Sequence, residues 1–439
     1  MVELPDTLTG LQQALARGEL SSTESLTAQR NRLKELDKKV HAVIALLPAQ
    51  GKPASAGSLA GIGLAHKDIF NTAGRMPGLG RDKGSAAPGL QAATVIQRLA
   101  GQGAAHMAAL TMAEYACGAT GDNSHFGRCI NPLHADAVVG GSSSGSAAAV
   151  AAHMAYGSLG TDTAGSVRMP AATCGLAGLK TTHGLLPTDG VFPLSPSLDN
   201  VGILARNPAD ATQILLAGAT HGRLRPPAGT SPRIKAWIPE TGLHASLALA
   251  MEDFSKQHKI GTRISECAQH ATLTHLSEIV LHVESARTHR TALLEGTSPA
   301  AVNAVAMAGL VIPVEWYVAA INARAQRARD FVAQHLTAHD IFMLPALSAP
   351  VPDWDQVTPG HASFDAMQLL GMHRYMGFAN YLGLPSLVVP IARDARGLPI
   401  SVQLMGRPFH ELTLLKFAQD IGLPHFKNDS ATLSFSPKD

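Results

Sequence analysis

The chain has 439 residues, of which 46% are apolar and 15% charged, and its formal net charge is +2. This composition indicates a soluble globular protein with a large core. A charge so close to zero gives no electrostatic reason to expect nucleic acid or an anionic membrane as a partner. The sequence has no repeat, low-complexity tract or obvious linker, so one domain over residues 1–439 is favoured.

Several features point to the cytoplasm. The opening stretch "MVELPDTLTG" is acidic and polar, unlike a signal peptide or anchor, and no run of eighteen apolar residues follows. The 20 histidines show no HExxH pattern and the cysteines no paired CxxC, so no metal site is expected. The four cysteines are scattered, as expected of buried thiols in a reducing compartment: Cys117, Cys129, Cys174 and Cys267.

The first elements are predicted to be packing helices. Leucines recur at helical spacing at Leu8, Leu11 and Leu15. Ser21 followed by Glu24 then predicts a capping box that opens a second helix. Neither helix carries residues that suggest chemistry.

Over residues 57–205 the sequence pattern changes to short apolar strands, Gly-rich turns and helices of small residues. Strands that alternate with helices predict an α/β layered fold. Residues 206–335 are expected to be mostly helical. The later stretch "LPSLVVPIARDARGLPISVQLMG" predicts a β-hairpin that turns at residues 394–397.

The stretch "GGSSSGSAAAV" at residues 140–150 is the first that suggests chemistry. A flexible linker is disfavoured because "DAVV" before it predicts a strand and "SAAAVAAHM" after it a helix. A phosphate loop is disfavoured because no Lys-Ser/Thr pair follows the glycines. Residues 141–145 also fit GxSxG, the elbow of α/β-hydrolases, which would make Ser143 the nucleophile. That motif is short, and nothing nearby nominates the Asp and His that it requires.

Two further segments support a different interpretation. A second Gly-rich turn lies in "LGTDTAGSVRMPAA", which contains Ser166. Upstream, Lys67 ends the apolar run "GIGLAH". Most lone lysines are solvated surface charges, but one at the end of an apolar strand is suited to lose its proton through desolvation.

Together these segments resemble the amidase signature family of serine hydrolases. The resemblance rests on "GGSSSGSAAAVAA", "LGTDTAGSVRMPAATCGLAGLKTTHG" and "SLDNVGILAR", and on the spacing of Lys67, Ser142 and Ser166. Later stretches such as "FANYLGLPSLVVP" are similar to the family's carboxy-terminal blocks, so the likeness is weakest over residues 206–335. It implies an α/β fold with one twisted mixed sheet between helices, a signature core at 57–205 and a variable, substrate-shaping region at 206–335.

The resemblance implies a Ser-Ser-Lys triad and no metal or organic cofactor. Ser166 would be the nucleophile, Ser142 the bridging serine behind a cis Gly141–Ser142 peptide, and Lys67 the base. A serine hydroxyl needs an adjacent base, and lysine can supply one only if burial lowers its pKa. Backbone N–H groups would form the oxyanion hole, those of Thr163, Ala164, Gly165 and Ser166. The neighbouring hydroxyls of Ser143, Ser144 and Ser146 are expected to satisfy the turn and the start of the following helix.

Other residues near these motifs are expected to be structural. For Arg168 an internal ion pair is favoured over a substrate contact, and Asp162 and Asp199 are expected to hold loops. His66 is expected to pack on the opposite side of its strand, with tuning of the site as the alternative. Ala164 stands where the family most often has glycine and would be strained if its φ were positive. Cys174 is expected in the core.

The resemblance implies cleavage of a carbon-nitrogen bond but leaves the substrate open. Alignment with the family puts Ala116, Cys117 and Gly118 near the pocket wall, and Trp316, Tyr317 and Arg324 in the region that commonly shapes specificity. The leading hypothesis is a hydrolase of linear amides that forms an acyl-enzyme and releases ammonia or an amine. Its partners would be a small-molecule amide or carbamate, with neither nucleic acid nor membrane, and a homodimer remains open.

Four alternatives stand beside it. The same triad could cleave carbamates, urethanes or ureido compounds, and it also serves glutamine-hydrolysing subunits of tRNA-dependent amidotransferases. An α/β-hydrolase with Ser143 as nucleophile leaves the lysine and the second glycine-rich block unexplained. A non-catalytic scaffold is disfavoured because Lys67, Ser142 and Ser166 are all present.

Overall fold

The computed structural model describes residues 3–48, 56–220 and 222–426. Met1 and Val2, the first residues of the acidic stretch that is unlike a signal peptide, lie outside this range. Among the described residues no single helix is long and apolar enough to span a membrane, although Ala300–Leu310 and Val314–His335 pass that test together as a pair bent by 93°.

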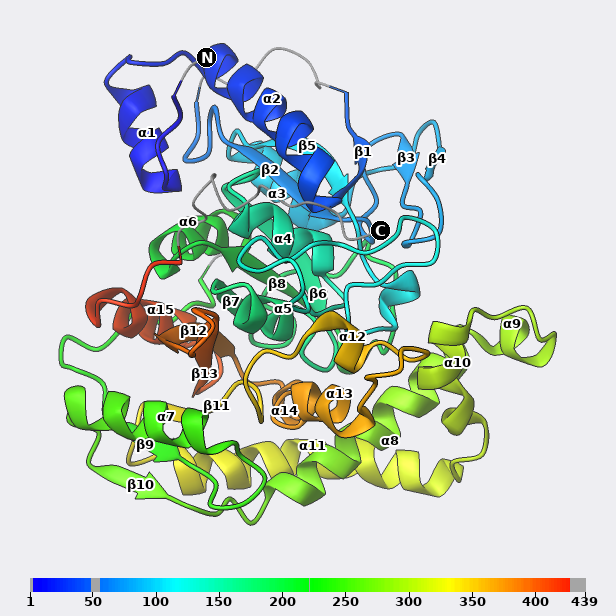
Figure 1. The fold of residues 1–439 in the computed structure, drawn as a ribbon, viewed down its shortest axis with the longest axis vertical. Coiled ribbons are helices and arrows are strands. Elements are labelled where there is room, and N and C mark those ends of the chain that lie inside the picture. Colours follow the sequence, from blue (N-terminus) through cyan, green and yellow to red (C-terminus); the bar gives the residue numbers. More distant parts are fainter. Residues whose placement is uncertain (1–2, 49–55, 221, 427–439) are drawn as a thin grey trace.

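An eight-stranded mixed sheet forms the centre of the described chain (Figure 1). β9 pairs in parallel with β10 and β11, and the remaining neighbours pair antiparallel. Most of these strands are buried on both faces, which explains their continuous apolar runs. In spatial order the strands are β10 (Thr262–Ile264), β9 (Ile234–Trp237), β11 (Ile341–Pro345), β13 (Pro399–Gly406), β12 (Ser386–Arg393), β7 (Ala177–Lys180), β8 (Asn200–Ala205) and β6 (Gly157–Asp162).

A smaller sheet lies beside the β6 end of the large one. It has the order β1 (Val43–Leu46), β5 (Ala105–Leu110), β2 (Gly63–Lys67), and β2 runs parallel to β5. Because β2 packs against β6, the end of the small sheet meets the edge of the large one. A short hairpin of β3 (Arg75–Met76) and β4 (Ser85–Ala86) follows β2.

Helices cover both faces of the large sheet. On β7, Gly178 lies against Ala171 of α5, whereas the adjacent Ala177 borders a pocket that α6 and α15 also line. The fold prediction of one α/β domain with a mixed sheet between helices is confirmed. The helices of the first half are α1 (Leu8–Ala16), α2 (Ser22–Val40), α3 (Thr94–Gly101), η1 (Glu114–Ala116), α4 (Ser144–Ala151), α5 (Arg168–Thr173) and α6 (Pro208–Gly218).

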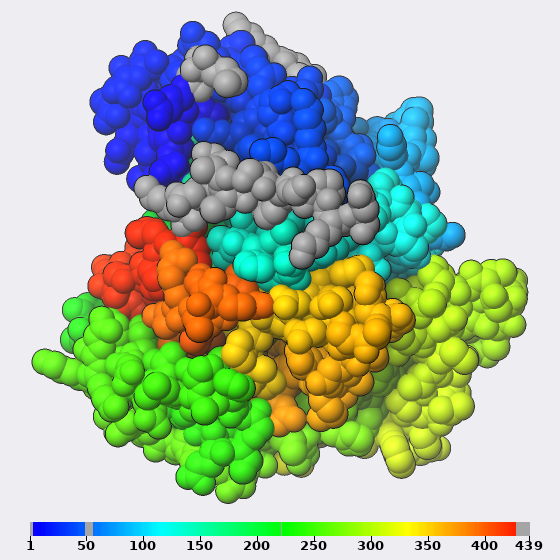
Figure 2. Space-filling model, viewed as in Figure 1, coloured from blue at the N-terminus to red at the C-terminus, as the bar shows by residue number. Residues whose placement is uncertain are grey.

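The second half adds a helical edge to the molecule. In the space-filling view the yellow-green residues of α8 to α10 form one side of the surface (Figure 2). These helices are α7 (Ala245–Gln257), α8 (His270–Thr288), α9 (Arg290–Leu294), α10 (Ala300–Ala306), η2 (Met307–Leu310), α11 (Val314–His335), α12 (Trp354–Val357), α13 (Ala366–His373), α14 (Gly377–Leu382) and α15 (Glu411–Asp420). Residues 206–335 are therefore mostly helical, but they also supply β9 and β10 to the central sheet.

A predicted helix cap and a predicted hairpin turn are present in the structure, whereas one predicted strand is not. The capping box is present, because Ser21 Oγ accepts from the Glu24 amide and Glu24 accepts from the Ser21 amide. The β12–β13 hairpin turns where expected, with Gly397 at φ 78°. The stretch "DAVV" is not a strand: Ala137 makes an isolated bridge to Asp353, and the Val138 amide donates to Pro352. Its apolar side chains are buried without a neighbouring strand.

Candidate active site

Lys67 ends β2 inside the protein, with 1% of its surface exposed. Its Nζ atom lies 2.7 Å from Ser142 Oγ and 2.8 Å from Thr161 Oγ1. Burial lowers the Lys67 pKa to about 7, against the opposing effect of the carboxylates of Asp199 and Asp162. At neutral pH a large share of this amine is therefore unprotonated and able to accept a proton.

Ser142 lies in the Gly/Ser-rich turn that leads into α4. The Gly141–Ser142 peptide is cis, as the resemblance implies. The Ser142 carbonyl accepts from the Ala113 amide at 3.1 Å. A Cβ atom on Gly141 would come within 2.8 Å of the Gly118 carbonyl, so only glycine fits there. The segment 113–118 thus packs directly on the turn that holds Ser142.

Ser166 lies in the loop between β6 and α5 and is partly exposed, which its predicted role as nucleophile requires. The Ser143 amide donates to the Ser166 carbonyl at 3.2 Å. This bond joins the two glycine-rich turns that the sequence places 24 residues apart. The structure therefore brings Lys67, Ser142 and the Ser166 loop into one region.

A buried ion pair fixes the Ser166 loop. Asp162 accepts from the amides of Gly165 and Val167 and pairs with the Arg168 guanidinium at 2.8 Å, and neither charged side chain is exposed. Although burial alone would raise it, the Asp162 pKa lies well below its usual range because of Arg168 and the Asn380 amide. Arg168 also donates to Asn380 Oδ1 and Gln403 Oε1. The expected internal ion pair of Arg168 is therefore present, with Asp162 as its partner.

The predicted oxyanion donors divide into two groups. The Gly165 amide donates to Asp162 Oδ1 at 2.9 Å, so this predicted donor is engaged elsewhere. The amides of Thr163, Ala164 and Ser166 have no acceptor among the described residues. Gly165, at φ 114°, carries the positive φ in this turn, and Ala164 does not. The alanine at position 164 therefore brings no backbone strain.

Two of the other three serines of this segment face β6 of the large sheet. Ser143 is fully buried and its Oγ atom approaches the Thr161 carbonyl at 3.5 Å, while Ser146 Oγ approaches Leu159 at the same distance. The expectation that these hydroxyls satisfy the start of α4 is wrong, because the helix has no side-chain cap. Ser144 Oγ has no partner among the described residues. A buried Ser143 also does not suit the α/β-hydrolase alternative.

Two more predicted structural residues lie near the triad. Asp199 accepts from Thr163 Oγ1 at 2.6 Å and from the amides of Leu194 and Ser195, and burial raises its pKa to about 6. His66 points away from Lys67 and accepts from the Leu159 amide through Nδ1. Cys174 and the other three cysteines are buried and free. These residues shape loops and core, as expected.

The predicted substrate residues are only partly accessible. Ala116 and Cys117 are buried, and Gly118 is exposed beside Gly141. Burial raises the Cys117 pKa to about 12, so its thiol is protonated and unreactive at neutral pH.

Of the three variable-region residues, two are held internally. Tyr317 donates to Glu284, and Arg324 donates to the carbonyls of Tyr381 and Asn380. Trp316 is exposed, at 56%.

Sequence reasoning missed four residues that shape the site. They are Thr161, Asn380, Gln403 and His373, and His373 hydrogen-bonds the Ala164 backbone. Thr161 could have been suspected, since it lies in "GTDTAGS" five residues before Ser166. The other three come from segments more than 200 residues away, and no local pattern marks them.

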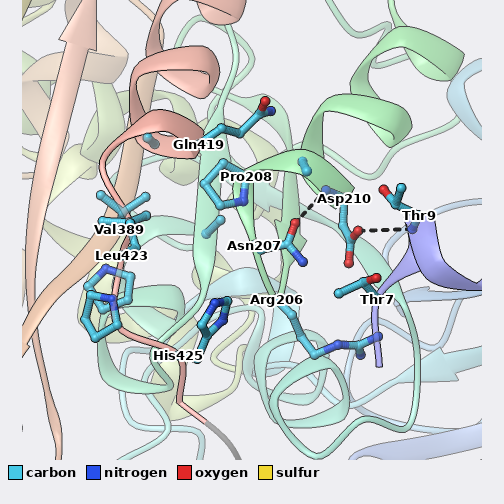
Figure 3. A pocket seen from close by; sticks show the side chains of 16 residues that line it. Thr7, Thr9, Arg206, Asn207, Pro208, Asp210, Val389, Gln419, Leu423 and His425 are labelled. Carbon is cyan, nitrogen blue, oxygen red and sulfur yellow. Dashed lines mark hydrogen bonds between the residues drawn. The ribbon is translucent and has the colours of Figure 1, made fainter. Parts of the chain in front are cut away.

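A separate pocket lies on the other side of β7, between α1, α6 and α15 (Figure 3). Its lining includes Arg206, Asn207 and Asp210, whose carboxylate is bonded to the amides of Leu8 and Thr9. None of the triad residues borders this pocket.

Comparison with known proteins agrees with the geometry. The family model described as Amidase matches residues 24–261 and 311–415. The chain belongs to the amidase family. Members of this amidase family hydrolyse carbon-nitrogen bonds, and the chain is accordingly a C–N hydrolase of that family.

The amidase-family chain is similar to several proteins over nearly its full length. It is 29% identical to the A subunit of the glutamyl-tRNA(Gln) amidotransferase of Geobacter metallireducens, over 94% of this chain and 96% of that one. A crystal structure of an amidase superposes with a TM-score of 0.83 at 25% identity, covering 95% and 100% of the two chains. An inhibitor-bound vestigial protein complex related to an s-triazine catabolic enzyme gives 0.85 at 23% identity, over 96% and 100%.

Proposed function

We propose that this chain hydrolyses linear amides through an acyl-enzyme on Ser166, with Lys67 as the base and Ser142 as the proton relay. The observation that carries the proposal is the 2.7 Å contact between the Lys67 amine, whose pKa burial lowers to about 7, and Ser142 Oγ. Lys180 has an equally lowered pKa but donates to the Thr181 carbonyl, whereas the Lys67 amine contacts a serine hydroxyl whose proton it can accept. It is well matched to general base catalysis near neutral pH.

The proposed reaction begins with two proton transfers. Neutral Lys67 accepts the proton of Ser142, Ser142 accepts that of Ser166, and Ser166 Oγ attacks the amide carbonyl. The oxygen then carries negative charge, which the free amides of Thr163, Ala164 and Ser166 are suited to receive. The proton returns along the same path to the leaving nitrogen, which departs as ammonia or an amine. Water then attacks the ester on Ser166 and releases the acid.

A product-release assay tests the proposal. The purified chain is offered primary amides, anilides, carbamates and free glutamine, and its Ser166→Ala variant is offered the same panel. We expect turnover of at least one amide, and both turnover and labelling by a fluorophosphonate should disappear in the variant. Labelling that survives Ser166→Ala would contradict the proposal.

A second candidate is a glutamine-hydrolysing subunit of an amidotransferase. It is favoured by relatives that are glutamyl-tRNA(Gln) amidotransferase A subunits, at 27–31% identity. This candidate predicts glutamine hydrolysis that depends on partner subunits and no turnover of simple amides. The carbamate and ureido alternatives use the same triad and are separated by the same panel.

A further inference from the structure

The bend between η2 and α11 exposes an unusual amount of apolar surface. Of the twelve large hydrophobic side chains exposed among the described residues, six lie between residues 307 and 318. Val311 is 81% exposed and Trp316 56%. We call this set the apolar tip: Met307, Leu310, Val311, Val314, Trp316 and Val318.

The composition of the segment reinforces the observation. Residues 296–323 contain a single charged residue, Glu315, whereas 15% of the whole chain is charged. Solvent-exposed helices normally carry charged side chains on their outer face. The inner face is accounted for, because Val302, Ala306 and Ala320 are buried and Tyr317 bonds Glu284 on α8. The outer face is therefore apolar although no described residue covers it.

The size of the patch matches an interaction surface. The exposures of the six side chains correspond to an area on the order of 600 Å², the upper end of what monomers expose. A stable interface buries about 800 Å² on each partner. The tip alone therefore offers about three quarters of the area that such an interface buries on one partner. Methionine and tryptophan, both present, are enriched in such contacts.

The charged residues around the apolar tip help to decide whether it binds a lipid surface or a protein. Segment 296–323 contains no lysine or arginine, which surface-bound helices use to attract anionic lipid. Arg287 of α8 acts electrostatically on Tyr317, so it lies near the base of the tip. Neither Glu315 nor Arg287 makes an ion pair with any described residue.

We propose that the apolar tip is the contact surface for a second copy of this chain. A two-fold axis pairs the same patch on both copies, and an apolar patch is complementary to itself. Each copy also offers Glu315 beside the tip and Arg287 near its base, two opposite charges without an ion pair in the described chain that can pair across such a contact. The low net charge of +2 lets two copies approach without strong repulsion.

The test is the mass of the full chain in solution, measured by light scattering at about 20 µM, where a micromolar contact is populated. We expect a dimer for the native chain and a monomer for Val311→Glu and Trp316→Glu. Leu249→Glu is the matched control, because Leu249 is 58% exposed but lies on α7, and this variant should remain a dimer. All four proteins should keep the same circular dichroism, since the substituted side chains are exposed.

A native chain that is monomeric at this concentration would overturn the proposal. A dimer that persists in both tip variants would overturn it as well, because the contact would then lie elsewhere. Flotation with neutral phosphatidylcholine vesicles is the second measurement. A monomer that binds these vesicles through the tip would assign the surface to lipid and not to a second copy.

Discussion

Lys67 Nζ and Thr161 Oγ1 lie 2.8 Å apart, joining the last residue of β2 to the penultimate residue of β6. The two strands belong to different sheets, and β6 leads directly to the Ser166 loop. The contact therefore orients the lysine from the strand that leads to the proposed nucleophile. It leaves the other hydroxyl contact, to Ser142, for the proposed proton transfer.

Removal of the Thr161 hydroxyl should weaken the base without removing it. In Thr161→Val the ammonium loses an acceptor that stabilises the charged form more than the neutral one, so the Lys67 pKa should fall below about 7. The acid limb of the pH profile of kcat should move to lower pH. The plateau rate should drop roughly tenfold, the value of one buried hydrogen bond.

Thr161→Ser is the control, because it keeps the hydroxyl and should keep the native profile. If Thr161→Val changes the rate but leaves the acid limb in place, Thr161 has only a packing role.

Activity should follow the protonation of Lys67. The proposed relay needs the neutral amine, so the acylation rate should rise with pH and reach half its plateau near pH 7, where burial places the Lys67 pKa. Lys67→Arg should be at least about a thousandfold slower at every pH, because guanidinium stays protonated and cannot accept a proton. Pre-steady-state acylation measured against pH checks both points. A Lys67→Arg enzyme with near-normal acylation would rule out lysine as the base.

The sequence could nominate the proposed triad because its members lie next to local signals. Lys67 ends an apolar strand, and Ser142 and Ser166 lie in glycine-rich turns whose spacing is itself a pattern. It could not find Asn380 or Gln403, whose contacts with Arg168 span more than 200 residues. Such contacts arise when β12 and β13 pack on α5 and when Asn380 of α14 accepts from Arg168, and polar residues in those elements carry no periodic mark. The strand predicted at "DAVV" is wrong for a related reason. A buried segment without a partner strand shows the same apolar pattern as a strand, and tertiary packing decides between them.

Glycine should be required at 165 and not at 164. Gly165 has φ 114°, and a Cβ atom there would lie 2.7 Å from the side chain of Met376. Gly165→Ala should therefore displace the loop next to Ser166 and lower kcat/KM at least about a hundredfold, the scale of a misplaced reacting group. Ala164→Gly, the matched change one residue earlier, should cost less than about tenfold. Equal losses in the two variants would contradict this account of the turn.

The two adjacent serines should differ sharply in importance. Ser142→Ala breaks the path between Lys67 and Ser166 and should lower acylation by about a hundredfold or more. Ser143→Ala removes only a weak contact of 3.5 Å with the Thr161 carbonyl and should keep most activity and fluorophosphonate labelling. Labelling rates of the two variants, measured beside Ser166→Ala, make the comparison. Loss of labelling in Ser143→Ala alone would restore the α/β-hydrolase alternative.

The Asp162–Arg168 pair should dominate the stability of the Ser166 loop. Asp162→Asn leaves Arg168 buried without a counter-charge and should cost about 3–5 kcal/mol, measured as the free energy of unfolding in urea. The folded-state pKa of Asp162 lies below the value of about 3.9 in an unfolded chain. Its contribution is therefore fully present above pH 4 and is lost as the pH falls through the folded-state pKa. The stability difference between the native chain and Asp162→Asn should be constant from about pH 5 to pH 8 and shrink below about pH 4.

Asp162→Asn combined with Arg168→Met should be less destabilised than the sum of the single variants, because neither charge is then left alone. Additive losses, or a difference that grows on acidification, would show that the pair does not act as a buried ion pair.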